Sequence, residues 1–439
     1  MPLRRFSARE YLVDFVGTIA NWPVYARREW MRREQLDAFA LDRTRAMAAF
    51  AAVHVPLYRD LYRHAGVDPQ AIRSWADVAR LPVVDKALIR DGYPDRSLAD
   101  GADLARCLIS TSSGSTGRMM VIPHRADRFW PYLLSSQRFL RWAAGGSYPP
   151  TWRQAYVYTS EYPLLRVPGF YPLRFIPTAA SPDAILKALE SFKPHILATY
   201  PSVLRDLVGV GADRMRALRL RGVSVGSELS TQEERDGWES LIGCPVRDEY
   251  SSEELGRIAS QCPEKRYHLH EDIVHTEILG ADGQPTDGLG EVVGTEFHNR
   301  TMPFVRYRQG DVARISLEFC PCGRRGRLLV DLAGRANDGF ILADGRTLAP
   351  GFLLDVCYRA LIGAGDTVVS AYRFVQRSPS QADFEVVPGP AFEPTHADAM
   401  RTSLEGELVG CGLTIRVVAI DEIERKPGGK RATVFRDMA

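Results

Sequence analysis

The chain has 439 residues, and its 56 Lys and Arg against 54 Asp and Glu give a formal net charge of +2. This length predicts more than one domain, and 45% hydrophobic with 25% charged residues is the balance of an ordinary soluble globular protein. The near-zero charge argues against nucleic-acid binding. No run approaches the ~20 apolar residues of a membrane span. The apolar stretch 11–24 lacks the cleavage site of a secretory signal. We therefore expect a cytoplasmic protein without a nucleic-acid partner or a membrane span.

The first 100 residues favour helices, including an apolar pattern over 27–55 that ends before Pro56. From residue 106 onward, short apolar runs that predict buried strands alternate with stretches that predict helices. Helix starts are indicated by Ser181-Pro182 and by a capping box over 230–233, with Gly243 closing the second helix. This alternation predicts a mostly parallel sheet. The four predicted strands are 107–109, 155–158, 195–198 and 223–225.

The last 170 residues have a different pattern. Apolar strands at 273–279, 291–297 and 305–308, separated by Asp-Gly turns, predict an antiparallel β subdomain. After Gly334, about 100 residues predict a small α+β domain whose elements are helices at 350–362 and 394–408 and a strand at 413–420. The predicted fold class is therefore α/β, with a large N-terminal domain (1–335: helical lead-in 1–100, α/β core 106–260, β subdomain 261–333) and a small mobile C-terminal lid domain (336–439).

A loop rich in glycine and hydroxyl side chains follows the first predicted strand. Its glycines allow tight backbone turns, and its hydroxyl and amide groups can donate to phosphate oxygens. It lacks the Gly-Lys-Ser/Thr ending of a Walker A loop. Placed between a strand and a predicted helical segment, it favours an anion cradle, although a plain Ser/Gly-rich turn is the alternative. The candidate phosphate-binding residues are Ser112, Ser113, Gly114, Ser115, Thr116 and Gly117.

Five further segments follow this loop in a fixed order, and the six together resemble the adenylate-forming superfamily of acyl-CoA synthetases, adenylation domains and luciferases. The resemblance covers about residue 50 to the C-terminus and is most specific for the branch that is similar to phenylacetate–CoA ligase and CapK. The five segments are Gly226-Ser227-Glu228, Tyr250-Ser251-Ser252-Glu253-Glu254-Leu255-Gly256, Tyr307-Arg308-Gln309-Gly310-Asp311, Gly334-Arg335-Ala336-Asn337-Asp338 and Gly428-Gly429-Lys430-Arg431.

The resemblance implies a role for each segment, and the chemistry of the side chains agrees. Tyr250 can stack on adenine, Glu254 can hold Mg²⁺ through oxygen ligands, and Asp311 can accept the ribose hydroxyls. Lys430 brings positive charge to the carboxylate and α-phosphate, which makes it, with Glu254, a candidate catalytic residue. Taken singly, Asp311 could be a turn residue and Lys430 a solvated tail lysine. The remaining candidate cofactor-binding residues are Ser227, Glu228, Asp248, Ser251 and Arg335.

The sequence departs from the superfamily pattern at three places. Ser251 stands where a glycine is usual, and Glu253 stands where Thr or Ser usually precedes the metal-binding glutamate. Met119-Met120 replaces the usual Pro-Lys after the phosphate loop, which leaves Arg118 as the nearby cation. An added carboxylate beside Glu254 could alter how metal or phosphate is held.

Four residues have the composition of a zinc site. Cys262, His268, Cys320 and Cys322 combine a Cys-x5-His with a Cys-x-Cys pair, and Zn²⁺ binds four such ligands tetrahedrally. Many proteins similar to phenylacetate–CoA ligase carry such a set, so a structural zinc is expected. His270 is the alternative histidine, and a set of reduced buried cysteines is the alternative interpretation.

The resemblance implies an enzyme that activates a carboxylic acid with ATP and Mg²⁺ as an acyl-adenylate. The acyl group would then pass to coenzyme A, or to an amine or hydroxyl in a biosynthetic variant; a homodimer is also expected. An ATP-independent acyltransferase is a second hypothesis, because His268 and Asp272 match a His-x-x-x-Asp pattern. A non-catalytic nucleotide-binding protein is a third. The segments 156–162, 200–201 and 226–227 are expected to line an acid pocket, and their aromatic content suits an aromatic acid.

Overall fold

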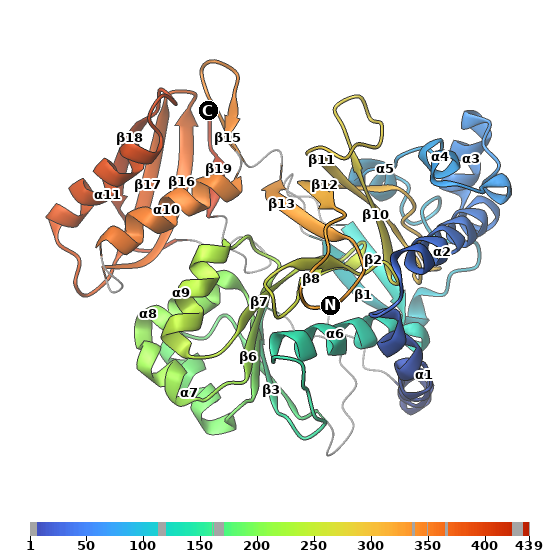
Figure 1. The fold of residues 1–439 in the computed structure, drawn as a ribbon, viewed down its shortest axis with the longest axis horizontal. Coiled ribbons are helices and arrows are strands. Elements are labelled where there is room, and N and C mark those ends of the chain that lie inside the picture. The colour runs from blue at the N-terminus through green and yellow to red at the C-terminus, as the bar shows by residue number, and fades with distance from the viewer. Residues whose placement is uncertain are drawn as a thin grey trace. The chain divides into compact units, whose positions relative to one another are not determined.

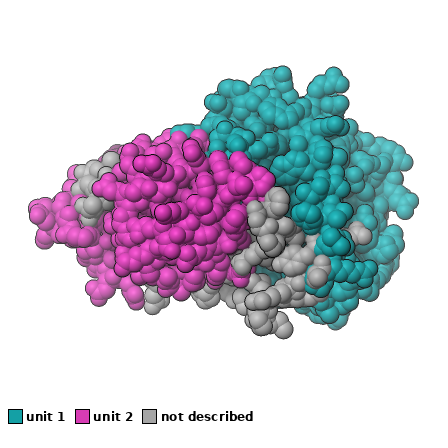
Figure 2. Space-filling model, turned by 90° about the horizontal axis from the view of Figure 1, so that it is seen from below, with its two compact units in different colours: residues 1–148, 162–167, 249–331 teal, residues 149–161, 168–248, 332–439 magenta. Residues whose placement is uncertain are grey.

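The computed structural model describes residues 7–112, 120–159, 161, 171–335, 339–348, 350–364, 368–423 and 433–438. The chain divides into two units, each built from separate stretches of sequence and coloured separately in Figure 2. Unit 1 contains residues 1–148, 162–167 and 249–331, and unit 2 contains residues 149–161, 168–248 and 332–439. Within the described residues, no helix combines the length and the apolar character that crossing a bilayer requires.

The N-terminal part of unit 1 is helical, as the sequence predicts. The expected helix over 27–55 is broken at residues 29–32, where Arg32 in an extended conformation begins a second helix, and Pro56 starts a third. Ser7 caps the first helix together with Glu10, which satisfies backbone N–H groups that have no partner inside the helix. The helices of unit 1 are α1 (Ala8–Arg28), α2 (Arg33–His54), α3 (Pro56–Ala65), α4 (Trp75–Ala79), α5 (Lys86–Asp91) and α6 (Trp130–Ala143).

The described strands of unit 1 pair antiparallel. The predicted β subdomain is confirmed, because β10 pairs with β11 and β11 with β12, both antiparallel. One prediction is wrong: the glycine-hydroxyl loop is followed by a strand and not by a helical segment. The apolar, partly β-branched run that begins at Met120 pairs antiparallel with 107–112. The strands are β1 (Cys107–Ser112), β2 (Met120–Arg125), β8 (Gly256–Gln261), β9 (Tyr267–Leu269), β10 (Val274–Leu279), β11 (Gly290–Glu296) and β12 (Tyr307–Ser316).

Unit 2 begins with a parallel α/β layer in which the strand order is β6-β5-β3-β4. Three of the four predicted strands are found in this layer, with ends shifted by at most one residue. The fourth, 107–109, is part of β1 in unit 1, which pairs antiparallel with β2 in a separate sheet. Ser181 caps α7 as expected, but the cap of α9 is Thr231, one residue after the predicted position. Figure 1 shows these elements in green. They are β3 (Gln154–Tyr158), β4 (Leu173–Pro177), α7 (Pro182–Phe192), β5 (Ile196–Thr199), α8 (Pro201–Ala217), β6 (Gly222–Gly226) and α9 (Gln232–Ile242).

The C-terminal part of unit 2 is the α+β fold that the sequence predicts, with a sheet of order β18-β17-β16-β19. Its core includes Phe374 and Phe384, which are fully buried and lie edge to face. The sequence reasoning missed the short β19, which pairs parallel with β16. The elements, orange to red in Figure 1, are β14 (Phe340–Ile341), β15 (Thr347–Leu348), α10 (Pro350–Ala364), β16 (Val369–Ser378), β17 (Gln381–Pro388), α11 (Pro394–Glu407), β18 (Thr414–Ala419) and β19 (Val434–Arg436).

Two strands cross from one unit to the other along the chain. β7 (Val246–Ser252) begins in unit 2 and ends in unit 1, whereas β13 (Leu328–Arg335) begins in unit 1 and ends in unit 2. The domain boundary expected at 335/336 stays a prediction.

Candidate functional site

The four predicted zinc ligands lie together in unit 1. The ligand atoms of Cys262, His268, Cys320 and Cys322 all lie within 4.8 Å of one another. The sulfurs of Cys262 and Cys320 are 3.6 Å apart, and Nε2 of His268 is 3.2 Å from the sulfur of Cys322. Ligand bonds of about 2.0–2.3 Å in a tetrahedron place neighbouring ligand atoms about 3.5 Å apart. The donor set therefore fits Zn²⁺ in both chemistry and spacing.

The surroundings favour thiolate at one of these cysteines. Although burial opposes charge on Cys322, the hydrogen bond with His268 and the backbone N–H of Arg324 lower its pKa to about 5. Burial raises the pKa of Cys320 to about 12. Trp142 packs in one apolar cluster with Cys262 and Cys320. Metal binding would displace the thiol protons of the other two cysteines, since the thiolate is the ligand.

The neighbouring histidine and aspartate have other partners. Nε2 of His270 lies 2.9 Å from the hydroxyl of Ser260, and its Nδ1 lies 3.2 Å from Arg138, so both ring nitrogens have partners other than the sulfurs. Asp272 accepts two hydrogen bonds from Arg138, at 2.8 and 2.7 Å. His268 and Asp272 are each 2% exposed. A His-x-x-x-Asp acyltransferase needs an open histidine, so this geometry argues against that hypothesis.

Tyr250 and Asp311 meet in unit 1. Tyr250 lies near the end of β7, and Asp311 follows Gly310 in β12; Gly310 has a φ of 85°, which favours glycine. The hydroxyl of Tyr250 donates to Oδ2 of Asp311 at 2.8 Å. The predicted adenine-stacking ring and the predicted ribose-binding carboxylate are therefore adjacent.

Glu254 lies in the turn between β7 and β8 and is 4% exposed. Its Oε1 accepts a hydrogen bond from the hydroxyl of Tyr307 at 3.2 Å and lies 3.7 Å from the ammonium of Lys86. The backbone near Lys86 is held beside Tyr307 and Arg308. Val84 forms a bridge with Tyr307, and the backbone N–H of Arg308 donates to the carbonyl of Val84 at 2.8 Å. The sequence reasoning missed Lys86, which belongs to no motif of the six.

Among the predicted cofactor-binding residues of unit 2, some also stabilise the local fold. Glu228 accepts hydrogen bonds from the backbone and hydroxyl of Ser202, at 2.9 and 3.1 Å, and so caps the start of α8. Ser227 has a φ of 66°, a strained conformation for serine that is common at functional sites. Buried Asp248 lies 3.7 Å from the guanidinium of Arg235.

The segments predicted to line the acid pocket end at one edge of the parallel sheet. Val157, Thr199 and Val225 are in register across β3, β5 and β6, so the residues after them lie side by side. Tyr158 and Tyr200 are buried there with ring centroids 4.5 Å apart. Ligands of open α/β sheets commonly bind outside this carboxyl edge, which agrees with the predicted pocket.

Several predicted residues lie outside the described part of the chain. The loop residues Ser113, Gly114, Ser115, Thr116 and Gly117 and the catalytic candidate Lys430 belong to this group, as do Asn337 and Asp338. The backbones of Ser112 and Arg335 are described as the last residues of β1 and β13. Their roles stay predictions.

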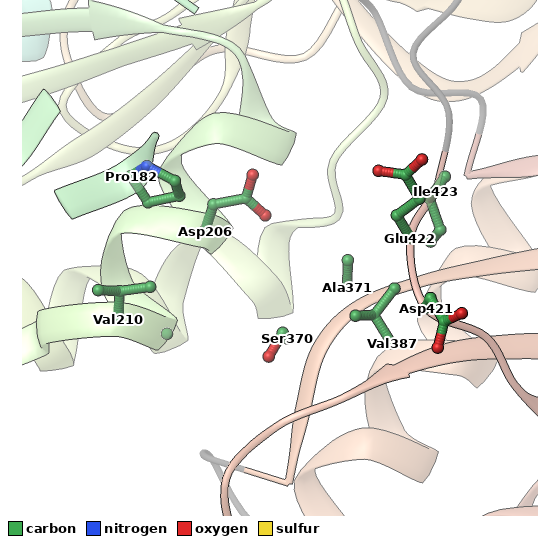
Figure 3. A pocket seen from close by; sticks show the side chains of 10 residues that line it. Pro182, Asp206, Val210, Ser370, Ala371, Val387, Asp421, Glu422 and Ile423 are labelled. Carbon is green, nitrogen blue, oxygen red and sulfur yellow. The ribbon is translucent and has the colours of Figure 1, made fainter. Parts of the chain in front are cut away.

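Unit 2 also contains a cavity of about 560 Å³. It lies between α7–α8 and the C-terminal sheet (Figure 3), and Asp206, Asp421 and Glu422 contribute carboxylates to its lining. A negatively charged lining repels phosphates, and none of the predicted cofactor-binding residues lines it. The cavity is therefore not the predicted nucleotide site.

Comparison with curated proteins places the chain near the phenylacetate–CoA ligases. No family model matches the chain. It is 28% identical over 337 residues to the phenylacetate–coenzyme A ligase of Thermus thermophilus, covering 72% of this chain and 73% of that protein. The Escherichia coli phenylacetate–coenzyme A ligase is 28% identical over 329 residues (70% and 73%). Protein CapK of Staphylococcus aureus is 26% identical over 136 residues (30% and 29%). The resemblance predicted from the motifs is confirmed.

Solved structures show the same fold. A 2-hydroxyisobutyryl-CoA ligase in the postadenylation state, in complex with an acyl-AMP, superposes with a TM-score of 0.78 at 21% identity over 94% of this chain and 92% of that chain. An anthranilate CoA ligase in complex with anthranoyl-AMP gives a TM-score of 0.56 at 15% identity, covering 76% of this chain and 67% of that chain. The predicted α/β fold class is confirmed.

Proposed function

We propose that this chain, a relative of the phenylacetate–CoA ligases, activates a carboxylic acid with ATP as an acyl-adenylate and transfers the acyl group to coenzyme A. The observation that carries the proposal is the similarity to curated phenylacetate–coenzyme A ligases over about 70% of the chain. Two contacts in unit 1 support it further. The hydroxyl of Tyr250 donates to Asp311, and the buried carboxylate of Glu254 lies near the ammonium of Lys86.

In the proposed adenylation step the substrate carboxylate attacks the α-phosphate of ATP and pyrophosphate leaves. The ring of Tyr250 faces the adenine and the carboxylate of Asp311 accepts the ribose hydroxyls. Lys430 stabilises the negative charge that develops between carboxylate and α-phosphate. Glu254 supplies the hard oxygen ligand that Mg²⁺ prefers, and a bound Mg²⁺ would neutralise charge on the phosphates.

The acid is proposed to lie at the carboxyl edge of β3, β5 and β6. The buried rings of Tyr158 and Tyr200 provide flat apolar surface there, which supports an aromatic acid. Arg153 and Arg166 are two basic residues that could bind a polar substituent of the acid. Arg153 lies at the opposite end of β3 and donates to the carbonyl of Lys193 at 2.7 Å, and Arg166 lies outside the described residues.

The cluster of Cys262, His268, Cys320 and Cys322 is proposed to hold one structural Zn²⁺. Four protein ligands leave no open coordination position, so the ion would hold β8, β9 and the segment after β12 together and take no part in the reaction. The cluster requires reduced thiols, which supports the predicted cytoplasmic location.

The test is ATP–pyrophosphate exchange with a panel of aromatic and aliphatic acids, followed by thioester formation with and without coenzyme A. Acid-dependent exchange is expected, with the highest rate for an aromatic acid. Exchange with no thioester, but with amide or ester after adding an amine or alcohol, would assign another acceptor. Acyl transfer without ATP would support the His-x-x-x-Asp hypothesis and contradict the proposal.

A further inference from the structure

An ordinary surface helix buries its apolar side and exposes its polar side. Helix α1 has the opposite orientation. Leu12, Val16 and Ile19 recur at a spacing of three to four residues and are 62, 55 and 60% exposed. The acidic residues Glu10 and Asp14 face into the protein, at 7 and 1% exposure. We call the exposed side chains the outer face of α1; they are Leu12, Val13, Phe15, Val16, Ile19, Trp22 and Val24.

This orientation is fixed by specific contacts with α6, beside which α1 lies at the periphery of unit 1 (Figure 1). Oδ1 of Asp14 accepts the backbone N–H of Trp130 at 2.7 Å, at the start of α6. A Cβ at Gly17 would lie 2.8 Å from the Trp130 ring, so only glycine allows this approach. At the end of α1, buried Glu29 pairs with Arg138 and Arg141. The apolar residues are therefore held outward.

The charges around the outer face are positive. All three acids among residues 7–33, which are Glu10, Asp14 and Glu29, are buried. Arg9 and Arg27 are exposed and lie seven and eleven residues from Val16, which places them on the same side of the helix. They flank the apolar centre at its two ends, about 27 Å apart along the helix at 1.5 Å per residue.

We propose that the outer face of α1 docks this protein onto an anionic lipid bilayer, with the helix lying in the interface. An apolar stripe with basic residues and aromatic rings is the pattern of helices that bind in the plane of a membrane surface. All seven side chains of the outer face are more than a third exposed, and a group of exposed apolar side chains on one helix is the kind of patch that marks an interaction site. The arginines would reach the headgroups from both ends while the apolar side chains enter the acyl boundary.

The positions of the charges favour lipid over a second copy of the chain. In a two-fold pair of antiparallel α1 helices with their apolar centres opposed, Arg9 of one copy faces Arg27 of the other at both ends. In a parallel pair each arginine faces its own counterpart. Like charges oppose both arrangements, whereas an anionic lipid surface attracts each basic residue.

The test is flotation of the full chain with phosphatidylcholine vesicles and with vesicles that contain ~30% phosphatidylglycerol. The wild type is expected to float with the anionic vesicles and to be released at high salt. Val16→Glu with Ile19→Glu should weaken partitioning by about tenfold or more, and Arg9→Glu with Arg27→Glu by a similar factor at low salt. Leu289→Glu and Val409→Glu, at positions 59 and 80% exposed, are matched controls that should not change it.

Thermal unfolding of each variant verifies that it is folded, and unchanged acid-dependent exchange separates this proposal from the proposed enzymatic function. Absence of wild-type binding to the anionic vesicles overturns the proposal. A wild-type dimer in light scattering that the α1 variants dissociate, without vesicle binding, also overturns it and assigns the outer face to a second copy. Equal loss of binding in the control variants would show that flotation is not specific to α1.

Discussion

The cysteine-histidine cluster and the candidate nucleotide site are organised in different ways. The cluster is complete within unit 1, and its four ligand atoms come from buried or half-buried side chains within 4.8 Å. The predicted nucleotide residues are divided: Tyr250, Glu254 and Asp311 belong to unit 1, whereas Ser227, Glu228 and Asp248 belong to unit 2. A structural metal site can be closed and permanent.

A ligase site must instead change during the reaction. In the proposed mechanism it first holds ATP against a carboxylate and then admits a thiol to the same carbonyl carbon. The side chains of such a site must act in one step and give way in the next, whereas four closed metal ligands only hold the fold. The comparison therefore predicts that substitutions in the nucleotide site affect individual reaction steps, and that substitutions in the cluster affect stability.

The largest effect is expected from Lys430→Ala, which should reduce acid-dependent pyrophosphate exchange by on the order of 10²-fold or more, because a charge that acts in the transition state is lost. Lys426→Ala, which removes a lysine from the same segment, is the matched control and should change exchange by less than about threefold. Exchange rates at saturating ATP and acid provide the measurement. An unchanged rate for Lys430→Ala would remove this residue from the proposed mechanism.

The segment Gly334-Arg335-Ala336-Asn337-Asp338 resembles the hinge of adenylate-forming enzymes, and we propose that a substitution in it separates the two steps. Proline at Asn337 fixes φ near −65° and is expected to retain one orientation of the C-terminal domain. Asn337→Pro should keep pyrophosphate exchange within about tenfold while thioester formation falls by on the order of 10²-fold. Asn337→Ala is the control and should leave both rates close to wild type. Equal losses in both steps would indicate a distorted site, and no loss in either would place the hinge elsewhere.

Much of the fold was predictable because local patterns agreed with the tertiary structure. Ser181 before Pro182 predicted the start of α7 to the residue, and the predicted strand 195–198 lies within one residue of β5. The segment after the glycine-hydroxyl loop was mispredicted because a short apolar run fits either a helix or a strand. Only the partner strand 107–112 decides between them.

The clustering of the four Cys and His residues was predictable from residue type, since cysteines in a Cys-x-Cys pair have few alternative uses in such a chain. Lys86 was not predictable, because the bridge between Val84 and Tyr307 that brings it to Glu254 joins positions 223 residues apart in the sequence. The orientation of α1 was also missed. Its sequence is apolar on one side, but only the contacts of Asp14 and Gly17 with Trp130 reveal that this side faces outward.

Loss of the cysteine-histidine cluster tests the prediction that substitutions in the cluster affect stability. Cys320→Ser with Cys322→Ser should lower zinc from about one ion per chain to near zero and lower the melting temperature by on the order of 5 °C or more. Exchange per folded molecule at low temperature should stay within about threefold, because four protein ligands leave the ion no open position for chemistry. Cys411→Ser, a cysteine of unit 2, is the control. Wild type that is metal-free and equally stable would contradict the zinc assignment.

The smallest effect is expected at the ion pair of Lys86 and Glu254, in which the ammonium offsets the negative charge of the carboxylate in the candidate nucleotide site. The ammonium is 25% exposed and 3.7 Å from the carboxylate oxygen, so the pair is worth about 1 kcal/mol. Because Mg²⁺ would compete with this ammonium for Glu254, Lys86→Met should lower the Mg²⁺ concentration for half-maximal exchange by about fivefold. Lys86→Arg keeps the charge and should stay near wild type. If the methionine variant needed as much Mg²⁺ as wild type, Glu254 would not be the metal ligand; if it needed more, Lys86 would itself help to hold the phosphates.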